Sequence, residues 1–129
     1  MVENTLDKII EKREQRLKKL KKSVSIDTLQ KKINENKSFI NFKEKVELNI
    51  SNNKISLIAE IKKTSPSAGL IIENYNPIDI AKKYNENKAT CLSVLTEEDF
   101  FLGNLIHISK IKEKVKLPIL CKDFFIDPF

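Results

Sequence analysis

The sequence predicts an α/β fold built from parallel strands. Three short apolar segments, at about 56–62, 90–95 and 117–122, have the length and composition of buried strands. A helical pattern separates each strand from the next, at about 77–85 and 104–115. Strands joined by one helix form βαβ units, in which the strands run parallel with right-handed crossovers. Because a closed eight-stranded barrel needs about 250 residues, any barrel formed by these 129 residues alone would be incomplete.

The first and third of these strands both end in charged residues. Glu60 and Lys62 alternate along the first strand, so both side chains project from the same face. The third strand ends in Lys122. Ligands of parallel α/β proteins bind beyond the carboxyl ends of the strands, where these three side chains are expected to meet. The alternative is a buried ion pair of Glu60 and Lys62 within a barrel layer, which would leave Lys122 without an explanation.

The segments that flank these charges supply further candidate pocket residues. Alternation places Ser93 and Leu95 on the inward face of the second strand, as pocket wall. The loop at 64–69 offers hydroxyls and a glycine, which suit an anion, although the glycine spacing of a P-loop is missing. The loop at 96–103 is acidic and then doubly aromatic, and paired phenylalanines serve packing more often than ligand contact.

The residues before the first strand are helical in pattern. The first segment carries one apolar stripe on a charged helix, with acids toward its start and lysines toward its end, as the helix dipole favours. A second short helix is expected at 28–33, with Asp27 as its N-cap. Asn-rich connections follow at 34–37 and 49–54. The stripe consists of Leu6, Ile9, Ile10, Leu17 and Leu20.

Composition and charge narrow the expected partners. The net charge of +6 comes largely from the first helix, which lacks the aromatics and glycine-rich loops typical of nucleic-acid binding, so we interpret it as a solvated face and expect no nucleic-acid partner. The sequence has no run of about 18 apolar residues and no signal-peptide centre, which predicts a cytoplasmic protein with no membrane partner. Cys91 and Cys121 are expected to be core residues, and we expect neither a metal nor a cofactor.

Three strand-and-loop segments resemble, in order and spacing, the first three barrel strands of indole-3-glycerol phosphate synthase. They are residues 58–67, residues 92–98 with Phe101, and residues 117–124. Residues 6–13 resemble the helical extension that precedes the barrel in that family. A single lysine at a strand end could occur by chance. Three successive strand-and-loop motifs with the family's order and spacing, over nearly the whole chain, are specific to the family.

The resemblance implies the N-terminal portion of a TIM (β/α)8 barrel with an N-terminal helical extension. Residues 1–54 would form the extension, and residues 55–129 the first three βα units, truncated before the third helix. Strands four to eight would be missing, and with them the second catalytic glutamate, the active-site asparagine and the phosphate-binding loops. We therefore expect an incomplete barrel that is inactive alone, with a complementing C-terminal half-barrel as its partner.

The resemblance also implies an activity, that of a carbon–carbon lyase of tryptophan biosynthesis. The phosphorylated substrate, 1-(2-carboxyphenylamino)-1-deoxyribulose 5-phosphate, is decarboxylated, closed into a ring and dehydrated. Lys122 matches the general acid that protonates the ketone oxygen, a role for which a lysine is chemically suited. Lys62 matches the lysine that pairs with substrate anions and is a candidate acid in dehydration, and Glu60 matches a carboxylate of the same proton network. The residues that match substrate contacts are Ser65, Phe101 and Phe124.

Three hypotheses for function remain open at this point. The chain belongs to an enzyme that works once its barrel is completed, or it is an inert product that does not fold stably. The third hypothesis is a small basic module that binds nucleic acid or a partner protein. Robust turnover by the isolated chain would contradict the expectation that it is inactive alone, and salt-sensitive binding to DNA or RNA without substrate binding would support the third.

Overall fold

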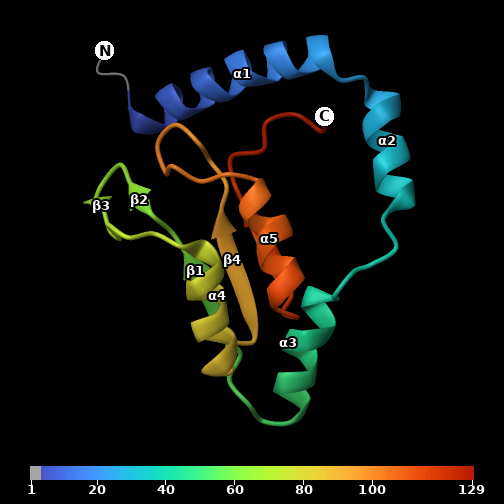
Figure 1. Ribbon diagram of the computed structural model, residues 1–129, viewed down its shortest axis with the longest axis vertical. Helices are drawn as coiled ribbons and strands as arrows, with labels where there is room; N and C mark the ends of the chain where they lie inside the picture. The colour runs from blue at the N-terminus through green and yellow to red at the C-terminus, as the bar shows by residue number, and fades with distance from the viewer. Residues whose placement is uncertain (1–3) are drawn as a thin grey trace. The chain divides into compact units, whose positions relative to one another are not determined.

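The computed structural model describes residues 4–129, which divide into two compact units (Figure 1). The first unit runs to Phe39 and includes Phe124–Phe129, and the second is Ile40–Asp123. The boundary expected between residues 54 and 55 stays a prediction. None of the helices in residues 4–129 has the length and apolar character needed to cross a membrane.

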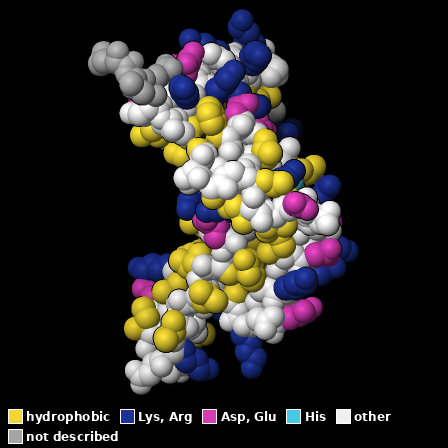
Figure 2. Space-filling view, turned by 90° about the vertical axis from the view of Figure 1, so that its left-hand side faces the viewer, with side chains coloured by type: hydrophobic (Ala, Val, Ile, Leu, Met, Phe, Trp, Pro, Cys, Tyr) yellow, Lys and Arg dark blue, Asp and Glu magenta, His cyan; other side chains and the backbone are white. Residues whose placement is uncertain are grey.

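Two helices make up most of the first unit. Helix α1 (Thr5–Ser23) begins at Asn4, whose side chain accepts a hydrogen bond of 2.9 Å from the Asp7 amide. Helix α2 is Ile26–Glu35. Lysine and arginine side chains gather over α1, as Figure 2 shows, in agreement with the predicted charged helix face.

The predicted N-cap of the second helix is wrong. Ser25, not Asp27, caps α2, because its hydroxyl accepts a 3.1 Å hydrogen bond from the Thr28 amide. Asp27 lies inside the first turn, where a negative charge is also favourable to the helix dipole. Serine and aspartate are comparable capping residues, so local sequence alone leaves the choice between them open.

The second unit contains the predicted parallel sheet. Strands β1 (Ile58–Ile61), β4 (Cys91–Leu95) and β5 (Ile119–Lys122) lie in the order β1-β4-β5, with both pairs parallel. Helices α4 (Pro77–Glu86) and α5 (Ile106–Lys114) connect them and lie side by side against the sheet (Figure 1). The expected succession of strands and helices is confirmed, including Pro77 in the first turn of α4 after the capping residue Asn76.

The hydrophobic core lies between the sheet and these two helices. Ile61 and Val94 contribute from the sheet, Ala81 from α4 and Ile111 from α5, and all four side chains are fully buried. Every residue of the central strand β4 is buried. In β1 buried positions alternate with more exposed ones, and in β5 half-buried positions alternate with exposed ones. Hydrophobic side chains are also visible on the molecular surface in Figure 2. Ile58 and Leu120, of the two outer strands, are among the exposed hydrophobic residues of this unit.

Three features of the second unit differ from the expectations or were not anticipated. Helix α3 (Phe42–Ser51) occupies a region without a predicted helix and includes the start of the Asn-rich connection expected at 49–54. Its Asn49 amide donates 3.1 Å to the Thr90 hydroxyl, which joins α3 to the start of β4. Strands β2 (Thr64–Ser65) and β3 (Gly69–Leu70) form a small antiparallel pair inside the expected loop.

The two cysteines lie in strands, as expected. Cys91 is buried in β4, and burial raises the pKa of its thiol although the charge of Lys45 opposes that shift. Cys121 in β5 is only half-buried. Both are free thiols. Cys91 is therefore a core residue, as expected, whereas Cys121 is not among the buried core residues.

Candidate active site

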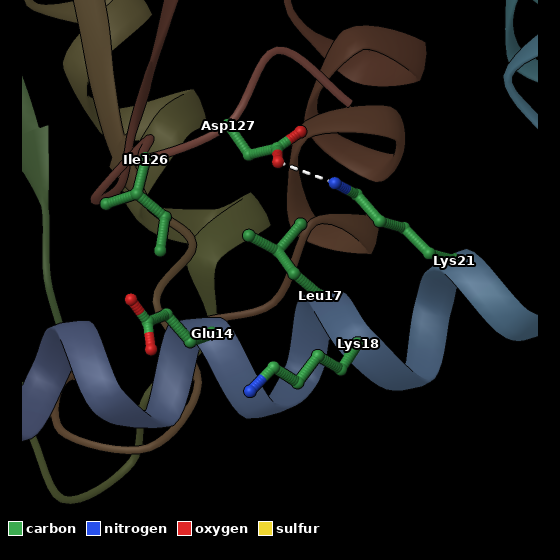
Figure 3. A pocket seen from close by; sticks show the side chains of 6 residues that line it. All are labelled: Glu14, Leu17, Lys18, Lys21, Ile126 and Asp127. Carbon is green, nitrogen blue, oxygen red and sulfur yellow. Dashed lines mark hydrogen bonds and ion pairs between the residues drawn. The ribbon is translucent and has the colours of Figure 1, made fainter.

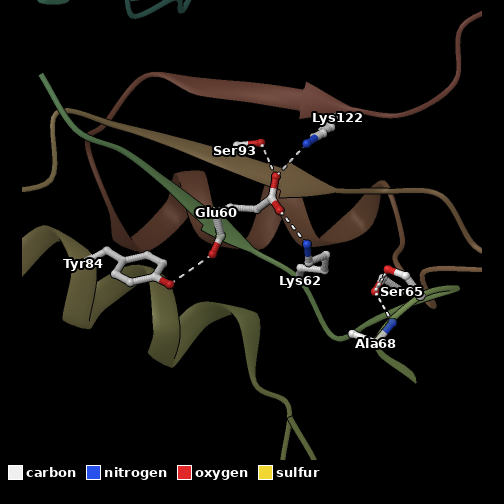
Figure 4. A network of polar contacts seen from close by, with 8 residues as sticks. Glu60, Lys62, Ser65, Ala68, Tyr84, Ser93 and Lys122 are labelled. Atoms are coloured by element: carbon white, nitrogen blue, oxygen red, sulfur yellow. Dashed lines mark hydrogen bonds and ion pairs between the residues drawn. The ribbon is translucent and has the colours of Figure 1, made fainter. Parts of the chain in front are cut away.

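Glu60 lies between the two lysines that the sequence singled out. Lys62 Nζ is 3.1 Å from Glu60 Oε1, and Lys122 Nζ is 2.9 Å from Glu60 Oε2 (Figure 4). One carboxylate thus joins ammonium groups from β5 and from the residue that follows β1. Two positive charges and one negative charge leave the cluster with a net charge of +1.

Strand register explains how residues so far apart in sequence come together. Glu60 is paired with Ser93 across β1 and β4, and Leu95 with Lys122 across β4 and β5. The Ser93 hydroxyl donates to Glu60 Oε2 at 3.4 Å, so the polar cluster extends over all three strands. Leu95 is buried at the end of β4. The inward positions predicted for Ser93 and Leu95 agree with this register, and their contact with a substrate stays a prediction.

The electrostatics of the cluster favour an ionised Glu60. Burial raises the pKa of the carboxyl, but the hydrogen bonds and charges of Lys122 and then Lys62 outweigh burial, so that the pKa of Glu60 falls below its ordinary value of 4.5. The three side chains are partly open to solvent, with exposed fractions of 30% for Glu60, 33% for Lys62 and 54% for Lys122. An incoming anion can therefore reach both ammonium groups.

Tyr84 holds the backbone of this cluster from the opposite side of the sheet. Its hydroxyl, on α4, donates a 3.0 Å hydrogen bond to the carbonyl oxygen of Glu60 (Figure 4). The contact ties the end of β1 to the helix that covers it. Tyr84 was not predicted from the sequence, because a tyrosine on the apolar face of a helix gives no local sign that its hydroxyl reaches a strand.

The Ser65 side chain takes part in the turn between β2 and β3. Its hydroxyl accepts a hydrogen bond from the Ala68 amide at 3.1 Å and lies 3.4 Å from the Ser67 hydroxyl. Thr64 donates to the carbonyl of Gly69 at 2.7 Å, and Gly69 has a φ of +67°, a conformation that favours glycine. Ser65 is thus part of an ordered turn beyond β1, and its predicted contact with a substrate is untested.

The two phenylalanines predicted to contact the substrate, Phe101 and Phe124, belong to different units. Phe101 is half-buried in the loop after β4, and its amide donates to Glu97 Oε2 at 2.9 Å. Phe124 belongs to the first unit. Both stay predictions as partners of an aromatic ring.

A pocket of about 390 Å³ lies in the first unit, and none of the residues predicted for the site is among those that line it (Figure 3). Lys21 and Asp127 form a 2.6 Å ion pair on its wall. That ion pair and the adjacent Phe129 amide hold the pKa of Asp127 below its ordinary range. The lining residues are Glu14, Leu17, Lys18, Lys21, Ile126 and Asp127. Across residues 4–129, no group of three or more histidine, cysteine, aspartate or glutamate side chains could hold a metal ion.

The family model and the curated relatives that match this chain all belong to one family. The model of the family described as indole-3-glycerol phosphate synthase matches residues 6–129. The synthase of Trichodesmium erythraeum is 40% identical over 126 residues, which cover 98% of this chain and 42% of that protein. The synthase of Aliarcobacter butzleri is 43% identical over 128 residues, covering 96% and 47%. A shorter match, to the synthase of Priestia megaterium, is 53% identical over 76 residues, covering 59% and 30%. The chain therefore spans less than half the length of these curated relatives.

Proposed function

Because this chain belongs to the indole-3-glycerol phosphate synthase family, we propose that it supplies the first three strands and part of the active site of such a synthase. The substrate would be 1-(2-carboxyphenylamino)-1-deoxyribulose 5-phosphate, which carries a carboxylate and a phosphate. The observation that carries this proposal is the bridge from Glu60 to both Lys62 and Lys122 at the ends of two parallel strands. A cluster of net charge +1, open to solvent, suits an anionic substrate.

Lys122 is the general acid of the proposed reaction. An ammonium group has three N–H donors, and Glu60 accepts from one of them. Another can donate its proton to the ketone oxygen of the substrate while the ring carbon that bears the carboxylate attacks the ketone carbon. This step forms the new carbon–carbon bond and turns the ketone into a hydroxyl. Loss of CO2 then leaves its bonding electrons with the ring.

Lys62 and Glu60 take part in binding the substrate anions and in the dehydration that follows loss of CO2. Lys62 pairs with the anionic groups of the substrate and donates a proton to the departing hydroxyl, which leaves as water. Loss of a proton from the ring then completes the indole. Glu60 holds both lysines and belongs to the same proton network. Ser65, Ser93, Leu95, Phe101 and Phe124 are the proposed substrate contacts.

Turnover is expected to need the part of the barrel that the relatives carry outside their match to this chain, since that match covers less than half of their length. The partner of the chain would then be a complementing C-terminal half-barrel. We expect no nucleic-acid partner, and we expect the chain to act in the cytoplasm.

The test compares the 129-residue chain alone with the same chain co-expressed with the segment of the Aliarcobacter butzleri relative that lies outside the match. Indole-3-glycerol phosphate formation is measured by fluorescence. We expect no turnover by either part alone and turnover by the pair. Robust turnover by the chain alone would contradict the need for a complementing half. A folded pair that neither binds nor converts the substrate would refute the proposed function, and salt-sensitive binding to DNA instead would favour a nucleic-acid module.

A further inference from the structure

The acidic and aromatic loop after β4 is built around one buried carboxylate, that of Glu97. The Glu97 side chain is 2% exposed, and its two oxygens accept hydrogen bonds from three successive backbone amides. Oε1 accepts from Asp99 at 2.9 Å, while Oε2 accepts from Phe100 at 2.7 Å and from Phe101 at 2.9 Å. The side chain therefore folds back over the chain that follows it and holds the backbone of both phenylalanines.

The end of the loop, at Gly103, is also fixed by a hydrogen bond and by close packing. The Gly103 amide donates to the carbonyl of Glu97 at 2.7 Å, which closes the loop into a ring. A Cβ atom at Gly103 would lie 2.3 Å from the carbonyl oxygen of Leu95, so only glycine fits against the end of β4. Leu102 takes a positive φ of 51° to make this return. The backbone of Phe101 is therefore fixed on both sides in the sequence, by the buried carboxylate of Glu97 and by Gly103, which packs closely against the end of β4.

The base of the same loop is joined to the strand end that carries Lys122. The Thr96 amide donates to the carbonyl of Lys122 at 3.0 Å, and the Thr96 hydroxyl donates to Asp123 Oδ2 at 2.7 Å. Thr96 directly precedes Glu97 in sequence. Hydrogen bonds of two adjacent residues, Thr96 and Glu97, therefore tie the loop to the backbone at Lys122 and to the backbone at Phe101.

We propose that Glu97 is a positioning residue, whose carboxylate holds Phe101 in place to receive the aromatic ring of the substrate beside Lys122. This inference rests on the proposed function, because it needs a substrate with an aromatic ring. The carboxylate suits the task for a chemical reason. It has two oxygens with lone pairs for all three amides, whereas a glutamine would turn an NH2 group toward at least one of them.

Burial of a carboxylate is costly unless hydrogen bonds compensate for the lost water, and the three amides provide that compensation. A loop needed only to connect β4 to α5 could be made of ordinary turn residues without a buried charge. The position of this charge, at the centre of the segment that carries Phe101, is what points to a role in binding.

The experiment uses the chain co-expressed with the complementing segment. Glu97→Gln is expected to raise KM about tenfold, the effect of losing one or two hydrogen bonds to a charged group, with kcat changed less than about twofold. Hydrogen exchange at the amides of residues 99–101 should become faster. Glu113→Gln, which removes the same charge from an exposed position on α5, is the matched control and should change neither quantity.

A double-mutant cycle with Phe101→Ala separates positioning from general stability. If Glu97 acts through Phe101, adding Glu97→Gln to Phe101→Ala should raise KM by less than about twofold further. Additive losses would overturn the proposal, as would unchanged exchange at residues 99–101 or a fall in kcat alone. If the wild-type pair neither turns over nor binds the substrate with its ketone reduced to an alcohol, the proposed function fails as well. If the wild-type pair turns over normally and Glu97→Gln leaves KM and hydrogen exchange unchanged, only the role of Glu97 is refuted.

Discussion

The two faces of the sheet β1-β4-β5 differ in what their side chains do. On one face, Ile61 and Val94 pack against α4 and α5 in a fully buried apolar core. On the other face, Glu60 and Lys122 form a charged cluster, while Leu120 beside them is 46% exposed. Because successive residues of a strand point to opposite faces, the same short strands supply both.

This difference indicates that stability and chemistry are separable in the second unit. Apolar burial on the helix face contributes most to the free energy of unfolding, because that contribution scales with the apolar area removed from water. The partly exposed ion pairs of the other face contribute little to stability, and their value lies in charge and position. Substitutions on the two faces should therefore have effects of different kinds.

The largest expected effect is that of Lys122→Ala on catalysis. In the chain co-expressed with the complementing segment, removal of the proposed general acid should lower kcat about 10² to 10⁴-fold. The fold should survive, since the Lys122 side chain is 54% exposed. Steady-state kinetics and circular dichroism would measure the two effects.

Lys116→Ala is the matched control for this substitution. It removes a lysine from an exposed position just before β5 and should leave kcat unchanged within about twofold. Near-normal rates for Lys122→Ala would refute its assignment as the general acid. An equal loss in both variants would point to total charge and not to position.

The next effect compares one side chain from each face. In the chain alone, Ile61→Ala should lower the free energy of unfolding by about 2–5 kcal/mol, because it leaves a cavity in the core. Leu120→Ala should cost less than about 1 kcal/mol, because that side chain is already half open to water. Urea unfolding followed by circular dichroism measures both. Equal losses would mean that the outer face is also covered in the isolated chain.

The smallest expected effect is the pH dependence due to Glu60. Its pKa in the folded chain lies below 4.5, so the stability that ionised Glu60 adds is present above pH 4.5 and is lost as the pH falls through the folded pKa. The difference in unfolding free energy between wild type and Glu60→Gln should therefore shrink when the pH is lowered from about 6 to about 3. With Lys62 and Lys122 both replaced by methionine, this pH dependence should disappear or reverse in sign, because burial alone raises the pKa of Glu60. If it persists unchanged, the lysines are not its cause.

Much of the second unit could be predicted from local sequence. The apolar runs of β4 and β5, the helical patterns between the strands and the capping pair of Asn76 and Pro77 are short-range signals, and the structure agrees with them. Helix α3 was missed because its apolar residues form no clear stripe, and its anchor, Asn49, reaches Thr90 at a separation of 41 residues. A contact over that distance leaves no periodic pattern in the sequence.

The loop after β4 shows the same limit within a few residues. Its acidic residues and paired phenylalanines are evident in the sequence, but nothing there says which acid turns inward. Glu97 does so because its side chain can reach the amides two to four residues ahead, as short polar side chains do at helix starts. The close approach of Gly103 to the carbonyl of Leu95 is likewise set by packing against β4.

The sequence alone determined that Glu60 and Lys62 share one strand face and that Lys122 ends another strand, because alternation along a strand is a local property. It also carried the family resemblance that the comparisons confirm. Only the tertiary structure decided that a single carboxylate holds both lysines. That contact depends on the register that pairs Glu60 with Ser93 and Leu95 with Lys122, and register is set by the packing of α4 and α5 against the whole sheet.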